Sequence, residues 1–250
     1  VDFDIKDPNK IQLFYRGEQI SIISTDNKEI LFYGIGNDGS RDSLLYRPMS
    51  SRINPYTSLF SDKAAYFLTV GDANGLRSKQ QGVIGSESIR PQGYHFAEEL
   101  KIYDSEYSLS TYQSIYPSFS NSFYEKGASK TGAWVVRDTL MISKVQLSHI
   151  NKNSSVIPNL ELLIHGRSNN ARQIDIFVGK DSSSLRKLTT VDIQGFTANK
   201  INENIRMDDI REDGNLFIAY QSLSKERLER YSIAYYKVRY AQNLDMNLNK

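Results

Sequence analysis

Apolar and polar residues alternate in short runs along the second half of the chain, and turn-forming residues separate these runs. In residues 159–165, Leu160, Leu162 and Ile164 share one face of an extended segment. Such alternation, with turn signals about every ten residues, is typical of an antiparallel sandwich. We therefore predict a jelly-roll-like sandwich with strands at 134–149, 157–165, 172–179, 185–193, 202–207, 214–222 and 229–241.

The first quarter of the chain has a less regular β pattern. Residues 10–24 predict a hairpin that turns at Gly17, because glycine adopts positive φ without penalty. Residues 28–35 predict the next strand, and Asn37-Asp38-Gly39 after it predicts a turn. Residues 64–70 are almost continuously apolar, so we predict a strand that is covered on both faces.

The middle of the chain has no clean strand period. Residues 72–93 are rich in Gly, Ser and Gln and predict a long loop or a hairpin with an irregular tip. Farther on, Phe96, Leu100 and Tyr103 recur at roughly helical spacing. This spacing predicts a short helix or a bridging segment between two β-units.

These patterns together predict a mostly β protein, with an antiparallel, jelly-roll-like β-sandwich preceded by a smaller irregular β-unit. The expected boundaries are 1–105 for the N-terminal β-unit, 106–130 for a packed connector and 131–250 for the sandwich.

Composition and charge exclude several functions. The 31 basic and 29 acidic residues are interspersed, so the chain has no field that suggests nucleic acid. It has no Cys, which rules out disulfides, thiolate metal sites and a cysteine nucleophile within it. It also has no apolar run of about 18 residues that could span a membrane. The chain lacks an initial Met and a signal peptide, so we expect a mature or excised fragment whose targeting signal was removed.

The histidines give no catalytic pattern. His95, His149 and His165 are far apart and form no metal-binding spacing, and no GxSxG elbow accompanies them. His165 ends a predicted strand, which favours a turn or edge role. We therefore expect no catalytic residue in this chain.

Adjacent acids occur at Glu98-Glu99 and at Asp208-Asp209. A glycosidase needs two carboxylates at a set separation across a cleft, whereas neighbours along a strand or helix point in different directions. These pairs are therefore expected to be solvated or capping groups.

One turn carries several oxygen ligands close together. Asn37, Asp38 and Asp42 flank Gly39, as the ligands of a calcium loop flank its sharp bend. The closing bidentate Glu of such a loop is missing, so a structural turn is favoured. A structural calcium ion held by Asn37, Asp38 and Asp42 is the alternative.

Aromatic residues gather around the irregular middle segment, namely Tyr112, Tyr116, Tyr124 and Trp134. Exposed rings on a sandwich can stack on sugars, but packing within the core or at a domain junction is the favoured role. Trp134 and Tyr124 are the candidate ligand or interface residues.

Several motifs carry a resemblance to one protein family. Residues 30–71 are the most specific stretch, and they contain Phe32-Tyr33-Gly34-Ile35-Gly36-Asn37-Asp38-Gly39 and Asn54-Pro55-Tyr56-Thr57-Ser58-Leu59-Phe60. The entry hairpin at 13–20 and the closing strand at 231–240 extend the similarity. The chain resembles the region just upstream of the catalytic domain in gingipain-type cysteine peptidases, above all the C-terminal sortase of the type IX secretion system.

The resemblance implies a non-catalytic accessory region of a secreted peptidase at the cell surface or outer membrane. The family's catalytic His and Cys would lie in a domain beyond Lys250, so no catalytic residue is carried over. The implied partners are that C-terminal catalytic domain, secreted cargo and outer-membrane proteins, and an exposed apolar patch is expected at the contact. The alternative function is a surface adhesin or a carbohydrate-binding sandwich module.

Overall fold

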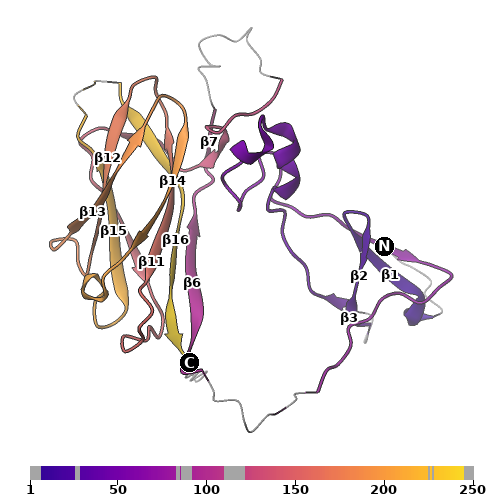
Figure 1. The fold of residues 1–250 in the computed structure, drawn as a ribbon. Coiled ribbons are helices and arrows are strands. Elements are labelled where there is room, and N and C mark those ends of the chain that lie inside the picture. Colours follow the sequence, from indigo (N-terminus) through magenta and orange to yellow (C-terminus); the bar gives the residue numbers. More distant parts are fainter. Residues whose placement is uncertain are drawn as a thin grey trace. The chain divides into compact units, whose positions relative to one another are not determined.

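The computed structural model shows a mostly β protein built from antiparallel sheets, which confirms the predicted fold class (Figure 1). Its chain divides into two units, Val1–Asp38 with Phe60–Arg90, and Gly39–Leu59 with Pro91–Lys250. The structure describes residues 7–25, 29–82, 85, 92–109, 122–224, 226 and 228–244.

The first unit contains a three-stranded antiparallel sheet in the order β2 (Glu18–Ile20), β1 (Ile11–Tyr15), β5 (Tyr66–Val70). Arg16 and Gly17, with φ of 53° and 86°, form the two-residue turn between β1 and β2. Positive φ at both positions suits the twist of a hairpin, so the predicted entry hairpin is confirmed.

A second small hairpin joins β3 (Ile22–Ser24) to β4 (Leu31–Phe32). The strand expected over 28–35 is therefore much shorter than predicted. The core of the unit consists of Ile11, Leu13 and Ile22, with partly buried neighbours that include Phe32 and Leu68.

The prediction for residues 64–70 was wrong in one respect. The strand β5 forms, but it lies at the edge of the small sheet and packs through one face. Phe67 on the other face is 67% exposed. A continuous apolar run therefore does not prove burial on both sides, because a small unit has too little mass to cover both faces of its sheet.

The second unit is the predicted sandwich. One sheet has the order β10-β15-β12-β13, and the other has the order β14-β11-β16-β6 with β9 added beside β16 (Figure 1). The strands are β6 (Tyr94–Ile102), β9 (Val135–Val136), β10 (Met141–Gln146), β11 (Asn159–Gly166), β12 (Arg172–Gly179), β13 (Arg186–Ile193), β14 (Ala198–Asn204), β15 (Asn215–Ser222) and β16 (Arg230–Asn243).

Two strands of the sandwich have different bounds in the structure from those predicted. The run 134–149 divides into β9 and β10, which pair with β16 in one sheet and with β15 in the other. Asp138, with a φ of 59°, lies in the turn between them. The strand expected at 202–207 begins earlier as β14, and a short 3₁₀ helix, η4 (Met207–Asp209), follows it.

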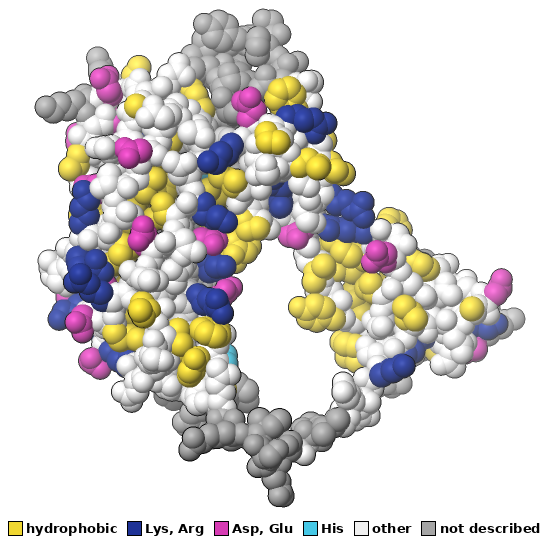
Figure 2. Space-filling view, in the orientation of Figure 1, with side chains coloured by type: hydrophobic (Ala, Val, Ile, Leu, Met, Phe, Trp, Pro, Cys, Tyr) yellow, Lys and Arg dark blue, Asp and Glu magenta, His cyan; other side chains and the backbone are white. Residues whose placement is uncertain are grey.

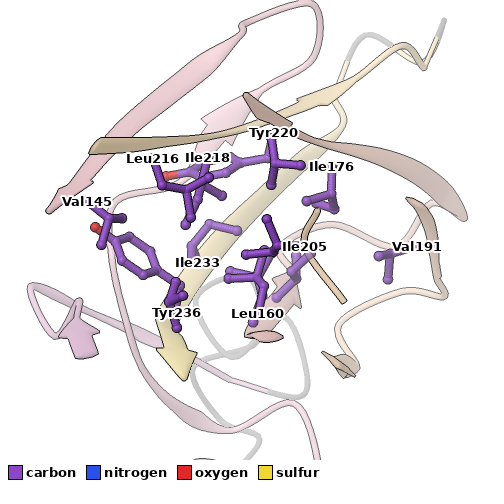
Figure 3. Close-up of a cluster of buried hydrophobic side chains, with 14 of the residues drawn as sticks. Val145, Leu160, Ile176, Val191, Ile205, Leu216, Ile218, Tyr220, Ile233 and Tyr236 are labelled. Carbon is purple, nitrogen blue, oxygen red and sulfur yellow. The ribbon is translucent and has the colours of Figure 1, made fainter. Parts of the chain in front are cut away.

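The core of the sandwich lies between the two sheets. Inward-facing residues of both sheets meet there, including Leu160, Ile176, Leu216, Ile218 and Ile233 (Figure 3). Their alternation along the strands is the pattern from which the sandwich was predicted.

The predicted short helix was also wrong, because residues 94–102 form the long strand β6. It pairs along its length with β16, from Ile102 opposite Tyr235 to Tyr94 opposite Asn243. In the structure, β6 is therefore part of the second unit rather than of an N-terminal unit ending at residue 105. The pairing with β16, a strand more than a hundred residues away, explains this difference.

Residues 39–59 also belong to the second unit. They contain the 3₁₀ helices η2 (Ser40–Leu45) and η3 (Met49–Ser51), and Ile53 and Tyr56 pack on buried residues of β11 and β16. Within the expected connector 106–130, β7 (Glu106–Ser108) pairs with β8 (Ser129–Thr131), and residues 110–121 lie outside the described residues.

No described helix is long and apolar enough to cross a bilayer.

Candidate functional site

Asn37 and Asp38, two of the candidate calcium ligands, lie in the first unit beside Arg16. One guanidinium nitrogen of Arg16 lies 3.2 Å from Oδ1 of Asn37 and 3.3 Å from Oδ1 of Asp38. The Nδ2 amide of Asn37 donates to the carbonyl oxygen of Ser61 at 2.7 Å. The guanidinium of Arg16 thus contacts the same side-chain oxygens that a calcium ion would need as ligands.

Asp42, the third candidate ligand, belongs to the second unit. Its carboxylate bonds residues of the Asn-Pro-Tyr motif segment. Its Oδ2 accepts a hydrogen bond from the hydroxyl of Ser58 at 2.9 Å and from the backbone N–H of Leu59 at 2.8 Å. Among the described residues, no three carboxylate, His or Cys side chains are grouped closely enough to hold a metal ion. The observed hydrogen bonds of Asp42 therefore favour a structural role over a role as a metal ligand.

Gly39 precedes η2 in a left-handed conformation, with φ 71° and ψ 15°. A Cβ built on Gly39 would lie 2.5 Å from the carbonyl oxygen of Thr57. Both the backbone conformation and the close approach of Thr57 therefore require glycine here.

The Asn-Pro-Tyr motif packs onto the sandwich. Asn54 is buried, and its Nδ2 donates to the hydroxyl of Ser129 at 2.9 Å while its Oδ1 accepts the N–H of Tyr56 at 3.0 Å. The ring of Tyr56 meets that of Tyr235 edge-on, with centroids 4.8 Å apart. The motif thus anchors an irregular segment to β16.

Tyr124 contributes to packing. Its ring lies 5.6 Å from that of buried Tyr46, whose hydroxyl donates to the carbonyl oxygen of Ala128 at 2.7 Å. Burial raises the pKa of Tyr46 well above its usual range. Tyr112 and Tyr116 lie outside the described residues.

Trp134 is 40% exposed and lies under an arginine. The guanidinium carbon of Arg230 is 3.3 Å from the centroid of the indole ring. A cation–π contact thus covers one face of the ring, which is the kind of face a sugar would need.

His165 was expected at a turn or edge, but it lies within β11, between β14 and β16, and is fully buried. Its Nδ1 is 3.2 Å from the carbonyl oxygen of Gly127. Burial and, to a lesser extent, the nearby charge of Arg167 lower the pKa of His165 to about 4, although the hydrogen bond to Gly127 acts in the opposite direction. His165 is therefore neutral near pH 7, and Gly127 can accept its ring N–H.

The pair Asp208-Asp209 has a capping role at Asp209. The carboxylate of Asp209 accepts from Nε of Arg186 at 3.0 Å and from the N–H of Arg206 at 2.9 Å, where η4 begins.

The adjacent acids Glu98 and Glu99 of β6 point to opposite faces of the strand. Glu98 forms an ion pair with Lys237 at 3.5 Å, whereas Glu99 lies 3.5 Å from the hydroxyl of Tyr240.

The first unit exposes several large apolar side chains. Ile23, Leu31, Tyr33 and Ile35 are all exposed, and Tyr33 reaches 80%. Figure 2 shows hydrophobic side chains gathered on this unit. An exposed surface of this kind, here on residues of the Phe-Tyr-Gly motif and its partner strand, is typical of a contact with another protein or domain.

Sequence reasoning missed a polar groove of about 600 Å³ that lies over β12 and β13. Its side chains bond one another across the two strands. Gln173 donates to Asp192 at 2.9 Å, and Thr190 donates to Asp175 at 2.8 Å. These residues alternate along their strands, but only the strand register brings them together.

No protein-family model and no curated protein matches the chain. Among solved structures, the chain is similar to dimeric latent PorU from Porphyromonas gingivalis, with a TM-score of 0.59 and 12% identity over 96% of this chain and 22% of PorU. The chain therefore spans less than a quarter of the length of PorU. At this identity the likeness shows the fold alone.

Carbohydrate-binding domains are more distant. The CBM36-1 domain of a multidomain xylanase from the hindgut metagenome of Trinervitermes trinervoides gives a TM-score of 0.34 and 13% identity over 57% of this chain and 96% of that domain. A CBM36 module in complex with calcium and xylotriose gives 0.31 and 11% over 58% of this chain and 98% of that module. These scores are too low to carry an argument about binding.

Proposed function

We propose that this chain is a non-catalytic accessory region of a secreted or cell-surface peptidase of the type IX sortase or gingipain kind. In this proposal it packs against the catalytic domain of the same polypeptide, and it supports that domain or presents it to cargo and outer-membrane partners. The observation that carries the proposal is the PorU-like fold over 96% of the chain, which includes both units.

The roles of the motif residues support a scaffolding function. Asp42 accepts hydrogen bonds from Ser58 and Leu59. Asn54 donates to Ser129 and accepts from the N–H of Tyr56. The bonds of Asp42 hold the segment 39–59 together, and the bond of Asn54 to Ser129 joins that segment to β8, as a structural region requires.

The exposed apolar side chains of the first unit provide a surface for the proposed domain contact. Leu31, Tyr33 and Phe67 are candidates, because each belongs to the most specific part of the family resemblance and is more than half exposed. Covering them with the catalytic domain would remove this surface from water.

A glycan-binding sandwich is the alternative, and its candidate residue is Trp134. The stacking of Arg230 on the indole and the packing of Tyr124 on Tyr46 favour structural roles for both aromatic residues. A glycan array that shows binding lost in Trp134→Ala would support the alternative instead.

Sequencing the gene beyond the codon for Lys250 is the first test of the proposal. We expect the reading frame to continue past Lys250 into a domain with a catalytic His and Cys, and a stop codon there would overturn the proposal. Purified chain should show no turnover of peptide substrates, whereas turnover lost on denaturation would contradict a non-catalytic role.

Binding to the separately produced catalytic domain tests the contact surface. Leu31→Ser should weaken this binding. Leu223→Ser is the matched control, because Leu223 is 61% exposed and Leu31 is 56% exposed, yet Leu223 lies in the sandwich unit. Equal effects of the two variants would contradict the proposed surface.

A further inference from the structure

The strand β6 forms an open edge of the five-stranded sheet. It pairs with β16 on one side, and no other described strand pairs with it. β6 runs from Tyr94 to Ile102 without a proline, so every backbone group that points away from β16 is available to a further strand. Its place at the margin of the sandwich is visible in Figure 1.

The register identifies the backbone groups that point away from β16. The N–H of Tyr103 donates to the carbonyl oxygen of Ala234 at 2.8 Å. Alternate residues of an antiparallel strand bond the same neighbour, so the odd-numbered residues of β6 bond β16. The N–H and C=O groups at Phe96, Glu98, Leu100 and Ile102 therefore point outward.

The side chains of β6 suit a partner that is itself a strand. Leu100 and Ile102 are exposed on one face of the strand. Glu98 on the same face is paired with Lys237. On the other face, Glu99 and Lys101 give the strand one charge of each sign.

We infer that β6 pairs with β6 of a second copy of this chain, antiparallel and with the two-fold axis at Leu100. Leu100 then lies opposite its own copy, and Ile102 lies opposite Glu98. Glu99 of each copy faces Lys101 of the other, which forms two cross-strand ion pairs. The outward backbone groups of the even-numbered residues bond one another in this register, so the two sheets become continuous.

Charge selects this register over its neighbours. A register with the axis at Glu99 or at Glu98 sets two identical carboxylates against each other, and one with the axis at Lys101 opposes two ammonium groups. Like charges directly opposite are destabilising in sheets. The axis at Leu100 is the one of these four positions that joins opposite charges. This inference does not depend on the proposed function.

Sedimentation velocity of the full chain at several concentrations tests the inference. We expect a reversible dimer that Glu99→Lys or Lys101→Glu weakens about tenfold, since each variant opposes like charges twice. The double variant E99K/K101E should restore the dimer. A mixture of the two single variants should form a heterodimer, because one copy then carries two basic side chains at positions 99 and 101 and the other copy carries two acidic ones.

Glu203→Lys is the matched control, since Glu203 lies on β14 at the opposite edge of the same sheet and, like Glu99, on its core-facing side. It should leave the dimer unchanged. A chain that stays monomeric at all concentrations would overturn the inference. So would a dimer that neither Glu99→Lys nor Lys101→Glu weakens, or one in which the double variant and the mixture fail to recover association.

Discussion

The ring nitrogen Nδ1 of His165 lies 3.2 Å from the carbonyl oxygen of Gly127. This contact joins the central strand β11 to a segment 38 residues earlier in the chain. Because the imidazole is fully buried, its charged form is disfavoured and its pKa falls to about 4. The contact is therefore sensitive to acid.

We predict that His165 makes the folded state less stable as the pH falls. The unfolded histidine binds a proton near pH 6.5, whereas the folded one does so near pH 4, so the unfolded state gains protons first. Between pH 7 and pH 5 this site should lower the free energy of unfolding by about 2 kcal/mol. Urea unfolding of the wild type and of His165→Gln measures the difference in pH slope.

His95→Gln is the control for this prediction, because His95 is only partly buried, on the edge strand β6. A change in pH slope that His165→Gln shows and His95→Gln does not is assigned to the buried imidazole. Equal slopes in the wild type and in His165→Gln would show that the buried imidazole does not titrate as argued.

Gly39 and Gly195 should respond differently to alanine, although both have positive φ, 71° and 57°. A Cβ at Gly195 meets its nearest atom at 3.9 Å, so Gly195→Ala should cost about 1–2 kcal/mol from backbone conformation alone. A Cβ at Gly39 lies 2.5 Å from the oxygen of Thr57, so Gly39→Ala should cost about 3 kcal/mol or more. Chemical denaturation of both variants tests this order, and a reversed order would contradict it.

Local signals in the sequence were enough to find most of the sandwich strands and the entry hairpin. Gly17 identified the first turn because two-residue hairpins need positive φ, and the alternation in β11 identified a strand whose Leu160, Leu162 and Ile164 face the core between the sheets. β6 was misread because residues four apart share a face in a helix and also in a strand. Phe96 and Leu100 satisfy both patterns, and the long-range pairing with β16 decided the outcome.

The candidate site depended on contacts that no local pattern contains. The family resemblance pointed to Asp42 and Asn54, but their partners Ser58 and Ser129 lie 16 and 75 residues away. The open edge of β6 follows from the order of strands in the sheet. Neither charge nor periodicity in the sequence determines that order.

Asp42→Asn should destabilise the second unit by about 1–3 kcal/mol. The substitution weakens the charge-assisted bonds from the hydroxyl of Ser58 and the N–H of Leu59. Asp104→Asn, at an exposed position of the same unit, is the matched control and should change stability by less than about 0.5 kcal/mol. Thermal unfolding followed by circular dichroism compares the two, and similar losses would contradict the role of Asp42.

Removal of divalent cations tests the calcium alternative at Asn37, Asp38 and Asp42. We expect EDTA to leave the unfolding temperature unchanged, because Arg16 bonds the first two residues and Asp42 bonds Ser58. A fall in unfolding temperature that added calcium reverses, and that Asp42→Asn abolishes, would establish a metal site instead.

The contact between Arg230 and Trp134 offers a direct optical test, since Trp134 is the sole tryptophan of the chain. Arg230→Ala removes the guanidinium from the indole face, so the fluorescence emission should move to longer wavelength as water reaches the ring. The free energy of unfolding should fall by about 0.5–2 kcal/mol. Arg239→Ala is the matched control, because Arg239 stacks on Phe96 at 4.0 Å and should leave the emission unchanged. An emission spectrum that responds equally to both substitutions would contradict the stacking of Arg230 on Trp134.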